Sequence, residues 1–279
     1  MKIFRKPGER TEIIGVRSVL VFIEAFGKVI TMRFLFLILT FVTVAVCTGC
    51  AALEASQKKA SYHYQMGLSF LAEGNYTRAL IDFSEAEKIT PDDPLLLNYL
   101  GQVYYFKKRY DLAETRYLRA IAVKPTFSEA RNNLGVNYLE MQRWDDAINQ
   151  LTIVKDDIFY QNHDAACMNL ALAYFGKGDY ATALTLLRPV MSSNPRNPVV
   201  RMNLGRVYFA DEKVGLAIAE FKKSIELSKD YARAHYNLAL AYLKIQETAA
   251  AKAEFNEVIR IDGDGEIGQL SKEYLEMLK

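Results

Sequence analysis

The three histidines and three cysteines of this sequence are among the side chains that could supply a nucleophile, a general base or a metal ligand. His63, Cys167 and His235 each lie four residues before a small residue of a repeated pattern, and His163 stands by itself in a predicted loop. Residues that recur at one position of a helical repeat usually pack against the neighbouring helix, and a buried cysteine behaves as a small apolar side chain. We therefore expect packing roles for these residues and no metal site.

Two short motifs resemble ligand-binding loops but lack essential positions. The Gly-Lys-Gly run at 176–178 has neither the flanking glycine nor the hydroxyl residue of a phosphate-binding loop. The Asp-Gly-Asp-Gly-Glu run at 262–266 begins like a calcium loop, but Ile267 occupies the sixth place, where that loop needs glycine. A turn that caps a helix is the simpler interpretation. We expect a protein that is not an enzyme, has no cofactor and has no small-molecule substrate.

Composition and charge exclude further classes of function. Apolar residues make up 51% of the 279 residues and charged residues 24%, which is typical of a chain with a sizeable core. Residues 1–49 hold seven of the 35 Lys and Arg and three of the 33 Asp and Glu, which leaves 28 basic and 30 acidic residues in 50–279. This balance does not favour nucleic-acid binding. Cys167 is the one cysteine after position 50, so no disulfide supports this part.

The elements that position these residues follow a repeat of about 34 residues. An aromatic residue follows each small residue by three positions, an alanine by twelve and a large apolar residue by sixteen. The pattern resembles the tetratricopeptide repeat, with its Leu-Gly-x-x-Tyr, Ala-x-x-x-Phe and closing proline. The resemblance implies two helices per unit, packed closely at the small residue. The small residues are Gly67, Gly101, Gly135, Ala171, Gly205 and Ala239.

We therefore expect an all-α fold, a right-handed superhelical solenoid of about six helix hairpins. Pro94 and Pro198 should open helices, and Gly74 and Gly178 should lie in the turns between paired helices. The third unit is two residues longer, so a longer loop is expected from Lys155 to His163. The expected units are 60–93, 94–127, 128–163, 164–197, 198–231 and 232–265, and residues 266–279 form a capping helix with Leu270, Tyr274 and Leu278 on one stripe.

Solenoids of this kind bind protein segments along the concave face that their first helices form. The positions three before, one after and four after each small residue should lie on that face. They are mainly apolar or aromatic, and Arg206 is the one basic residue among them, so a basic clamp for a terminal carboxylate is not expected. We predict a groove for an apolar or amphipathic protein segment, strongest around 168–209, although some of these side chains could pack between repeats. The predicted residues are Tyr64, Leu68, Leu71, Asn98, Gln102, Tyr105, Asn132, Val136, Leu139, Met168, Leu172, Phe175, Met202, Arg206, Phe209, Tyr236, Leu240 and Leu243.

Residues 32–49 have the parts of a signal peptide. Arg33 precedes an uncharged run, and small residues precede Cys50, as in the bacterial lipobox, although Cys47 stands where that motif prefers leucine. We expect lipid on Cys50, which would tether the chain to a membrane through a linker at 50–59. Residues 1–31 are then an extension before the true start at Met32, or a cytoplasmic segment. An uncleaved membrane anchor and a plain secretory signal are the alternatives.

The leader, the lipidatable cysteine and the six repeats together resemble the pilotin-like type IV pilus biogenesis/stability lipoproteins. The stretches Ala-Arg-Asn-Asn-Leu-Gly at 130–135 and Asn-Leu-Ala-Leu-Ala-Tyr at 169–174 carry the resemblance, with the longer third unit between them. It implies an outer-membrane lipoprotein that faces the periplasm and helps the secretin, the pore of the pilus, to assemble. The alternatives are an adaptor lipoprotein in polysaccharide export or cell-wall assembly, and an adaptor anchored in the inner membrane.

Overall fold

The computed structural model describes residues 32, 34, 36, 37, 39–41, 50 and 53–279, and the chain divides between His63 and Tyr64 into two compact units. Residues 1–31 and most of the leader at 32–49 lie outside the described residues. In the first unit, residues 53–63 are helical and the Cys50 thiol is free and exposed. Within the described ranges, no helix has both the length and the apolar character needed to cross a membrane.

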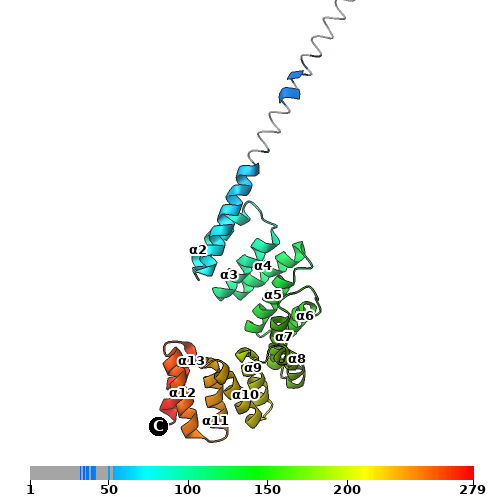
Figure 1. The fold of residues 1–279 in the computed structure, drawn as a ribbon. Coiled ribbons are helices and arrows are strands. Elements are labelled where there is room, and N and C mark those ends of the chain that lie inside the picture. Colours follow the sequence, from blue (N-terminus) through cyan, green and yellow to red (C-terminus); the bar gives the residue numbers. More distant parts are fainter. Residues whose placement is uncertain (1–31, 33, 35, 38, 42–49, 51–52) are drawn as a thin grey trace, which may run out of the picture. The chain divides into compact units, whose positions relative to one another are not determined.

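The second unit consists of helices that follow one another as hairpins (Figure 1), and no strand occurs in its residues 64–279. The prediction of an all-α fold is confirmed. Residues 64–72 are helical and pack on α2 (Tyr76–Glu87). The later hairpins are α3 (Pro94–Phe106) with α4 (Tyr110–Val123), α5 (Ser128–Glu140) with α6 (Trp144–Lys155), α7 (His163–Lys177) with α8 (Tyr180–Ser193), α9 (Pro198–Ala210) with α10 (Val214–Leu227), and α11 (Ala232–Lys244) with α12 (Thr248–Asp262), followed by α13 (Glu266–Met277).

The small residue of each repeat lets the two helices of a hairpin pack closely. A β-carbon added at Gly101 would lie 2.5 Å from the ring of Tyr117, and one at Gly205 would lie 2.4 Å from the ring of Phe221. Both rings are buried, so neither can move aside without opening the core. The repeated small residue therefore sets the distance between the paired helices, as its position in the sequence predicted.

Helix ends also follow the sequence signals. Pro94 and Pro198 are the first residues of α3 and α9, where a missing N–H costs no hydrogen bond. Gly74 and Gly178 have left-handed backbone angles, with φ of 73° and 86°. The other four hairpin turns use the same left-handed conformation without glycine, which is less favourable for residues with a β-carbon. These four residues are Lys108, Gln142, Glu212 and Gln246.

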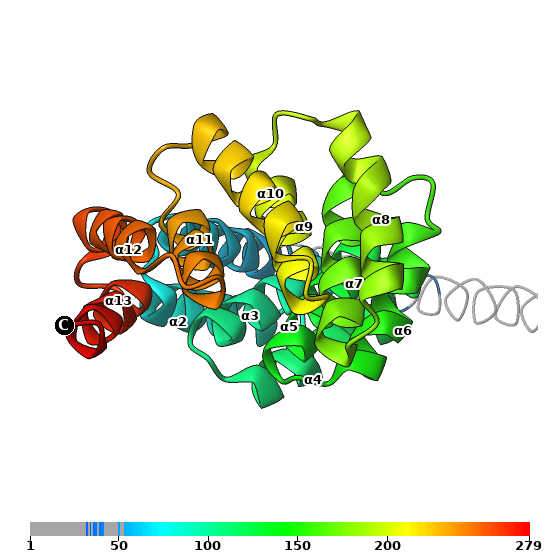
Figure 2. The ribbon, with the colours of Figure 1, turned by 90° about the horizontal axis from the view of Figure 1, so that it is seen from below.

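Stacking of the hairpins produces a curved surface. First helices contact one another in succession, α3 with α5, α5 with α7, α7 with α9 and α9 with α11, whereas successive second helices of the described part make no contact of this extent. Helices that crowd together on one side and separate on the other bend the stack toward the crowded side. Figure 2 shows the helices following one another around this turn, from α2 to α13. The first helices therefore form the inner face.

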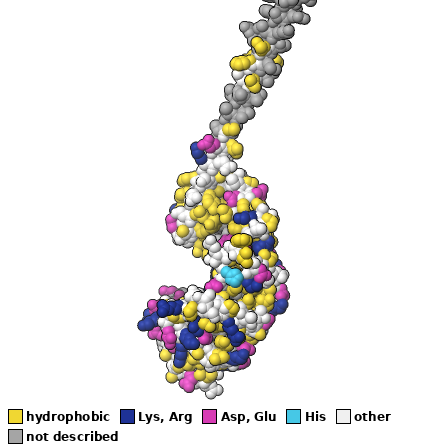
Figure 3. Space-filling model, turned by 45° about the vertical axis from the view of Figure 1, so that its right-hand side comes forward, with side chains coloured by type: hydrophobic (Ala, Val, Ile, Leu, Met, Phe, Trp, Pro, Cys, Tyr) yellow, Lys and Arg dark blue, Asp and Glu magenta, His cyan; other side chains and the backbone are white. Residues whose placement is uncertain are grey.

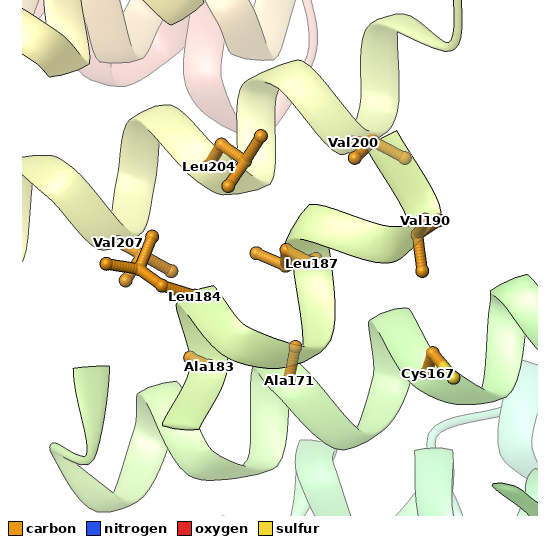
Figure 4. Close-up of a cluster of buried hydrophobic side chains, with 9 residues drawn as sticks. All are labelled: Cys167, Ala171, Ala183, Leu184, Leu187, Val190, Val200, Leu204 and Val207. Atoms are coloured by element: carbon orange, nitrogen blue, oxygen red, sulfur yellow. The ribbon is translucent and has the colours of Figure 1, made fainter. Parts of the chain in front are cut away.

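Buried apolar clusters join successive hairpins. The cluster in Figure 4 contains residues of α7, α8 and α9, with Leu187 close to its middle. At the carboxyl end, the Tyr274 ring of α13 stacks on Phe255 with centroids 5.0 Å apart, and Leu278 packs beside it. The prediction that Leu270 packs on the same stripe is wrong, because its side chain is exposed. The longer loop is present between the end of α6 and the start of α7.

Candidate protein-binding face

Most of the side chains predicted for the inner face are half-buried, as expected for residues that line a concave surface without being part of the core. They come from the first helix of every hairpin, so the face runs the length of the second unit. The half-buried members are Tyr64, Leu68, Leu71, Gln102, Tyr105, Asn132, Val136, Leu139, Met168, Leu172, Phe175, Arg206, Phe209, Tyr236, Leu240 and Leu243.

Asn98 and Met202 are exceptions to the predicted set. Asn98 is 2% exposed and Met202 is 4% exposed, so their side chains are not available to a ligand in this structure. Asn98 Oδ1 accepts a hydrogen bond of 3.0 Å from Asn133 Nδ2 on the next first helix. The contact with α5 covers Asn98, and Met202 is buried in α9, so the expectation that these two residues line the face is corrected.

Amide side chains pair with one another along the inner face of the first helices. Besides the bond between Asn133 and Asn98, Asn169 Nδ2 of α7 donates to Asn132 Oδ1 of α5 at 3.1 Å. These pairs join α3 to α5 and α5 to α7. Because each amide oxygen accepts from a neighbouring amide, the pairs hold the first helices together and leave fewer polar groups for a partner.

Two aromatic residues of the face pack against the beginning of their own second helix. The Tyr105 ring lies 5.7 Å from the Tyr110 ring, and the Phe175 ring lies 5.9 Å from the Tyr180 ring. The Tyr105 hydroxyl also lies 3.4 Å from a carboxylate oxygen of Glu140. Burial, and to a smaller extent the Glu140 charge, raises the pKa of Tyr105 to about 12, so its hydroxyl remains a neutral donor. These rings are held in place but keep part of their surface open.

Arg206 is the polar centre of the face in α9. Its guanidinium carbon lies 4.9 Å from the centre of the Phe175 ring, a cation–π contact. Burial lowers the pKa of Arg206, and the nearby positive charge of Arg233 lowers it further. Sequence reasoning did not include Arg233, although it lies one helical turn before Tyr236. That spacing of three residues was the signal that could have placed it on the same face.

His235, His163 and Cys167 form structural contacts with neighbouring residues. His235 is buried, with Nδ1 2.6 Å from Glu254 Oε2 and Nε2 2.9 Å from the Lys229 carbonyl oxygen. The prediction that His163 stands by itself in a loop is wrong. It opens α7, its Nε2 lies 2.9 Å from the Lys155 carbonyl oxygen, and its Nδ1 lies 3.6 Å from the Cys167 sulfur. Burial raises the pKa of the Cys167 thiol, which disfavours the reactive thiolate.

Carboxylate clusters, the 262–266 run and a surface cleft are other places in the described structure where a ligand could bind. No group of three His, Cys, Asp or Glu side chains that could hold a metal ion occurs in the described ranges. In the 262–266 run, Gly265 precedes α13, and a β-carbon there would lie 2.2 Å from the Asp262 carboxylate, so the run forms a tight helix-opening turn. A cleft of about 450 Å³ lies away from the inner face and is lined by residues that include Lys124, Arg131 and Phe159.

Comparison with known proteins agrees with this architecture. Models described as TPR repeat or tetratricopeptide repeat match residues 67–108, 99–152, 165–194, 205–246 and 232–264. Among curated proteins, the chain is 25% identical over 202 residues to the BBSome complex member BBS4 of Bos taurus, covering 72% of this chain and 38% of that protein. It is 34% identical over 105 residues to a peroxisomal targeting signal receptor of Candida albicans, covering 37% of this chain and 18% of the receptor. The chain thus spans less than two fifths of either relative.

Solved structures with a similar fold include pilF and PilW. The Pseudomonas aeruginosa pilF structure has a TM-score of 0.62 at 18% identity, covering 79% of this chain and 99% of that one. The structure of PilW, a widely conserved type IV pilus biogenesis factor, has a TM-score of 0.68 at 19% identity, covering 76% and 97%. At these identities the likeness shows the fold alone. Together, the hairpins, the close-packed small residues and the repeat matches show that this chain is a tetratricopeptide-repeat protein.

Proposed function

We propose that this protein is a membrane-tethered scaffold of the type IV pilus machinery. Lipid on Cys50 holds it at the outer membrane, facing the periplasm, and its inner face binds an apolar or amphipathic segment of a pilus protein such as the secretin. Tetratricopeptide-repeat proteins are in general non-enzymatic scaffolds for protein–protein interactions, so the proposal concerns which partner is bound and where.

The observation that carries the proposal is the row of half-buried apolar and aromatic side chains along the first helices. Val136, Leu139, Leu172 and Phe175 remain partly open on α5 and α7 although the core beneath them is closed. An apolar surface that a solvated chain leaves open is usually a site of protein interaction. The curvature of the stack brings these side chains to one side, where an extended or helical segment can contact several hairpins together.

The pilus assignment rests on two further observations. The sequence resemblance to pilus lipoproteins covers the lipidatable cysteine as well as the repeats, and the Cys50 thiol is free and exposed. The structural match to pilF and PilW extends over nearly the whole length of each of those two chains. An adaptor role in polysaccharide export or cell-wall assembly would use the same fold with another partner.

A double substitution on the inner face tests the binding site. Phe175→Asp combined with Phe209→Asp should abolish capture of the partner from solubilised membranes, while the helical circular-dichroism signal is retained. The matched control is Ile81→Asp with Leu216→Asp, two exposed apolar residues of the second helices α2 and α10. The control should capture the partner as the native chain does. Unchanged capture by the inner-face variant would refute the assignment of this face.

The pilus role is tested in cells. Deleting the gene should remove secretin multimers from the outer membrane, and the native chain should restore them. A Cys50→Ala variant should fail to restore them because it cannot carry lipid, and mass spectrometry of the native protein should find the lipid on Cys50. Normal secretin multimers in the deletion strain would reject the pilus assignment and favour another envelope system.

A further inference from the structure

Two arginine side chains of the inner face lack an acidic partner. Arg206 of α9 is half-buried and Arg233 of α11 is exposed, and neither guanidinium forms an ion pair within residues 64–279. Each lies close enough to the other for its charge to act on its neighbour, and Arg233 also acts on Tyr105 across the inner face. The curvature of the stack therefore gathers positive charge at one place on a mainly apolar surface.

Other arginines of the same stack have carboxylate partners. Arg201, one turn before the middle of α9, lies 2.8 Å from Glu220 of α10. Arg143, which opens the third hairpin's second helix, lies 2.8 Å from Glu114 and 2.7 Å from Asp146. Arg188 and Arg196 also form no ion pair in the described structure, but both are exposed. Arg206 differs from them because it is half-buried on the face that we propose binds a partner.

A partly buried, unpaired guanidinium is unfavourable for the free protein. Removal from water disfavours the charged form, and a second positive charge nearby adds repulsion. The contact between Arg206 and the Phe175 ring offsets part of this cost and holds the guanidinium in the face. An incoming carboxylate would offset both the cost of removing the guanidinium from water and the repulsion between the two arginines, because guanidinium groups form charge-assisted, often bidentate hydrogen bonds with carboxylates.

The apolar surface continues on both sides of the two arginines. Leu172 and Phe175 lie on α7, before them, and Tyr236 and Leu240 lie on α11, beyond Arg206. A segment that ended at the arginines would leave one of these apolar regions uncovered. The arrangement therefore favours an acidic residue in the interior of a bound segment over a free carboxyl terminus.

We propose that Arg206 and Arg233 together bind the side-chain carboxylate of an Asp or Glu that lies within an apolar segment of the protein partner. This inference rests on the proposed function, because it assumes that the inner face is the partner-binding surface. It adds the chemistry of the partner: apolar residues on either side of one internal acid.

Peptide selection on the full chain, purified in detergent, tests this specificity. One library displays random 12-residue segments joined to the carrier protein at both ends, and a second displays them with a free carboxyl terminus. The native chain should enrich segments of the first library that carry an internal Asp or Glu between apolar residues. The Arg206→Gln, Arg233→Gln variant should still enrich apolar segments, without the preference for an acid.

The other outcomes separate the two proposals. Enrichment of apolar segments without an acid would overturn the arginine site and leave the apolar binding face standing. An acid preference confined to free carboxyl termini would overturn the internal carboxylate. If neither library is enriched by the native chain, both the arginine site and the proposed binding face fail. Enrichment of segments from this chain's own sequence would show self-association and also overturn the inference.

Affinities of one selected peptide provide the quantitative test. Changing its acid to the matching amide should weaken binding to the native chain about tenfold, the effect of losing one charge-assisted hydrogen-bonded pair. The same change should have less than about a twofold effect on the double glutamine variant. Arg188→Gln removes an equal charge from the exposed side of α8 and should keep the tenfold difference. Equal weakening by all variants would reject the site.

Discussion

The inner face differs between the helices α3, α5 and α7 and the helices α9 and α11. On the first three, polar side chains satisfy one another through the amide pairs of Asn133 with Asn98 and Asn169 with Asn132. On the last two, Arg206 and Arg233 have no acidic partner among the described side chains. In the face shown in Figure 3, hydrophobic side chains gather over the upper, N-terminal helices, and Lys and Arg, with Asp and Glu among them, gather over the lower, C-terminal ones.

The difference separates two uses of polar groups on a repeated scaffold. A buried amide that is hydrogen-bonded to its neighbour stabilises the stack, and its loss leaves the other amide unsatisfied. An arginine without an acid adds little to the free protein and keeps its hydrogen-bonding groups for a ligand. Removal of one of the paired amides should therefore lower stability, and removal of an unpaired arginine should raise it.

The largest effect is expected from Asn133→Ala in the paired region. The buried Asn98 oxygen loses its donor at 3.0 Å, and an unsatisfied buried polar group costs about 1–3 kcal/mol. The free energy of unfolding in urea should fall by about 2 kcal/mol. Asn256→Ala is the control, because that exposed amide donates only to Lys252 of its own helix. If both variants unfold alike, the amide pair does not stabilise the stack.

His235 is a paired polar residue of α11, and its contribution to stability should depend on pH. Hydrogen bonding to Glu254, aided by the Lys229 carbonyl, raises the pKa of His235 above its ordinary value of 6.5. Because the folded pKa is the higher one, the stabilisation is complete below the unfolded pKa and is lost as pH rises through the folded pKa. At pH 6 the free energy of unfolding of the native protein should exceed that of His235→Gln by about 1.5 kcal/mol, the lower end of the range for a hydrogen bond to a charged group.

The difference between native protein and His235→Gln should shrink by pH 9, measured by urea unfolding at both values. A difference that does not change with pH would mean that His235 acts through packing alone and that its charge contributes nothing.

The substitution Arg206→Met should raise the free energy of unfolding, whereas the substitutions above should lower it. The substitution removes a partly buried, unpaired charge and fills the same space with an apolar side chain, at the expense of the contact with Phe175. We expect the free energy of unfolding to rise by about 1 kcal/mol, because exchange of a poorly compensated buried charge for an apolar group is often stabilising. Arg188→Met, on the exposed side of α8, should leave it unchanged. A destabilised Arg206→Met variant would make Arg206 a structural residue.

The smallest effect should be the same in both regions. Lys108 and Gln246 have φ of 56° and 63° in equivalent hairpin turns, and each should gain about 0.5 kcal/mol when replaced by glycine, after the entropy cost of glycine is included. Lys107→Gly, one position earlier at φ of −81°, should destabilise the protein instead. Unequal gains at the two turns in thermal unfolding would show that the hairpin backbones differ, and not the inner-face side chains alone.

Much of the fold could be predicted because residues with the same local structural effect recur at equivalent positions of the repeats. Gly101 and Gly205 predict a close helix pair, and Pro94 and Pro198 predict helix starts, from residues only a few positions apart or one hairpin apart. The left-handed turns without glycine could not be predicted. Lys108 and Glu212 adopt that conformation because the packed helices on either side impose it, against the preference of the residues themselves.

The candidate face could be predicted less completely, because membership of a face is not the same as exposure on it. A repeat position identifies which side of a helix a residue occupies, and this holds for Leu172 and Phe175. It does not tell how closely the next first helix approaches, which is what buries Asn98 and Met202. His163 was placed in a loop because the third unit is two residues longer, but that loop ends at Asn162 and His163 is the first residue of α7.

The sequence alone determined the repeating helical hairpin and the apolar character of its first helices, since both depend on contacts between residues that recur at a constant spacing. Only the tertiary structure decided which polar groups of the inner face are paired and which are left open. Arg233 and Tyr105 belong to helices separated by four repeats, and only the accumulated curvature of the stack brings them near each other. That curvature is the sum of many small rotations between neighbouring hairpins, which no single repeat contains.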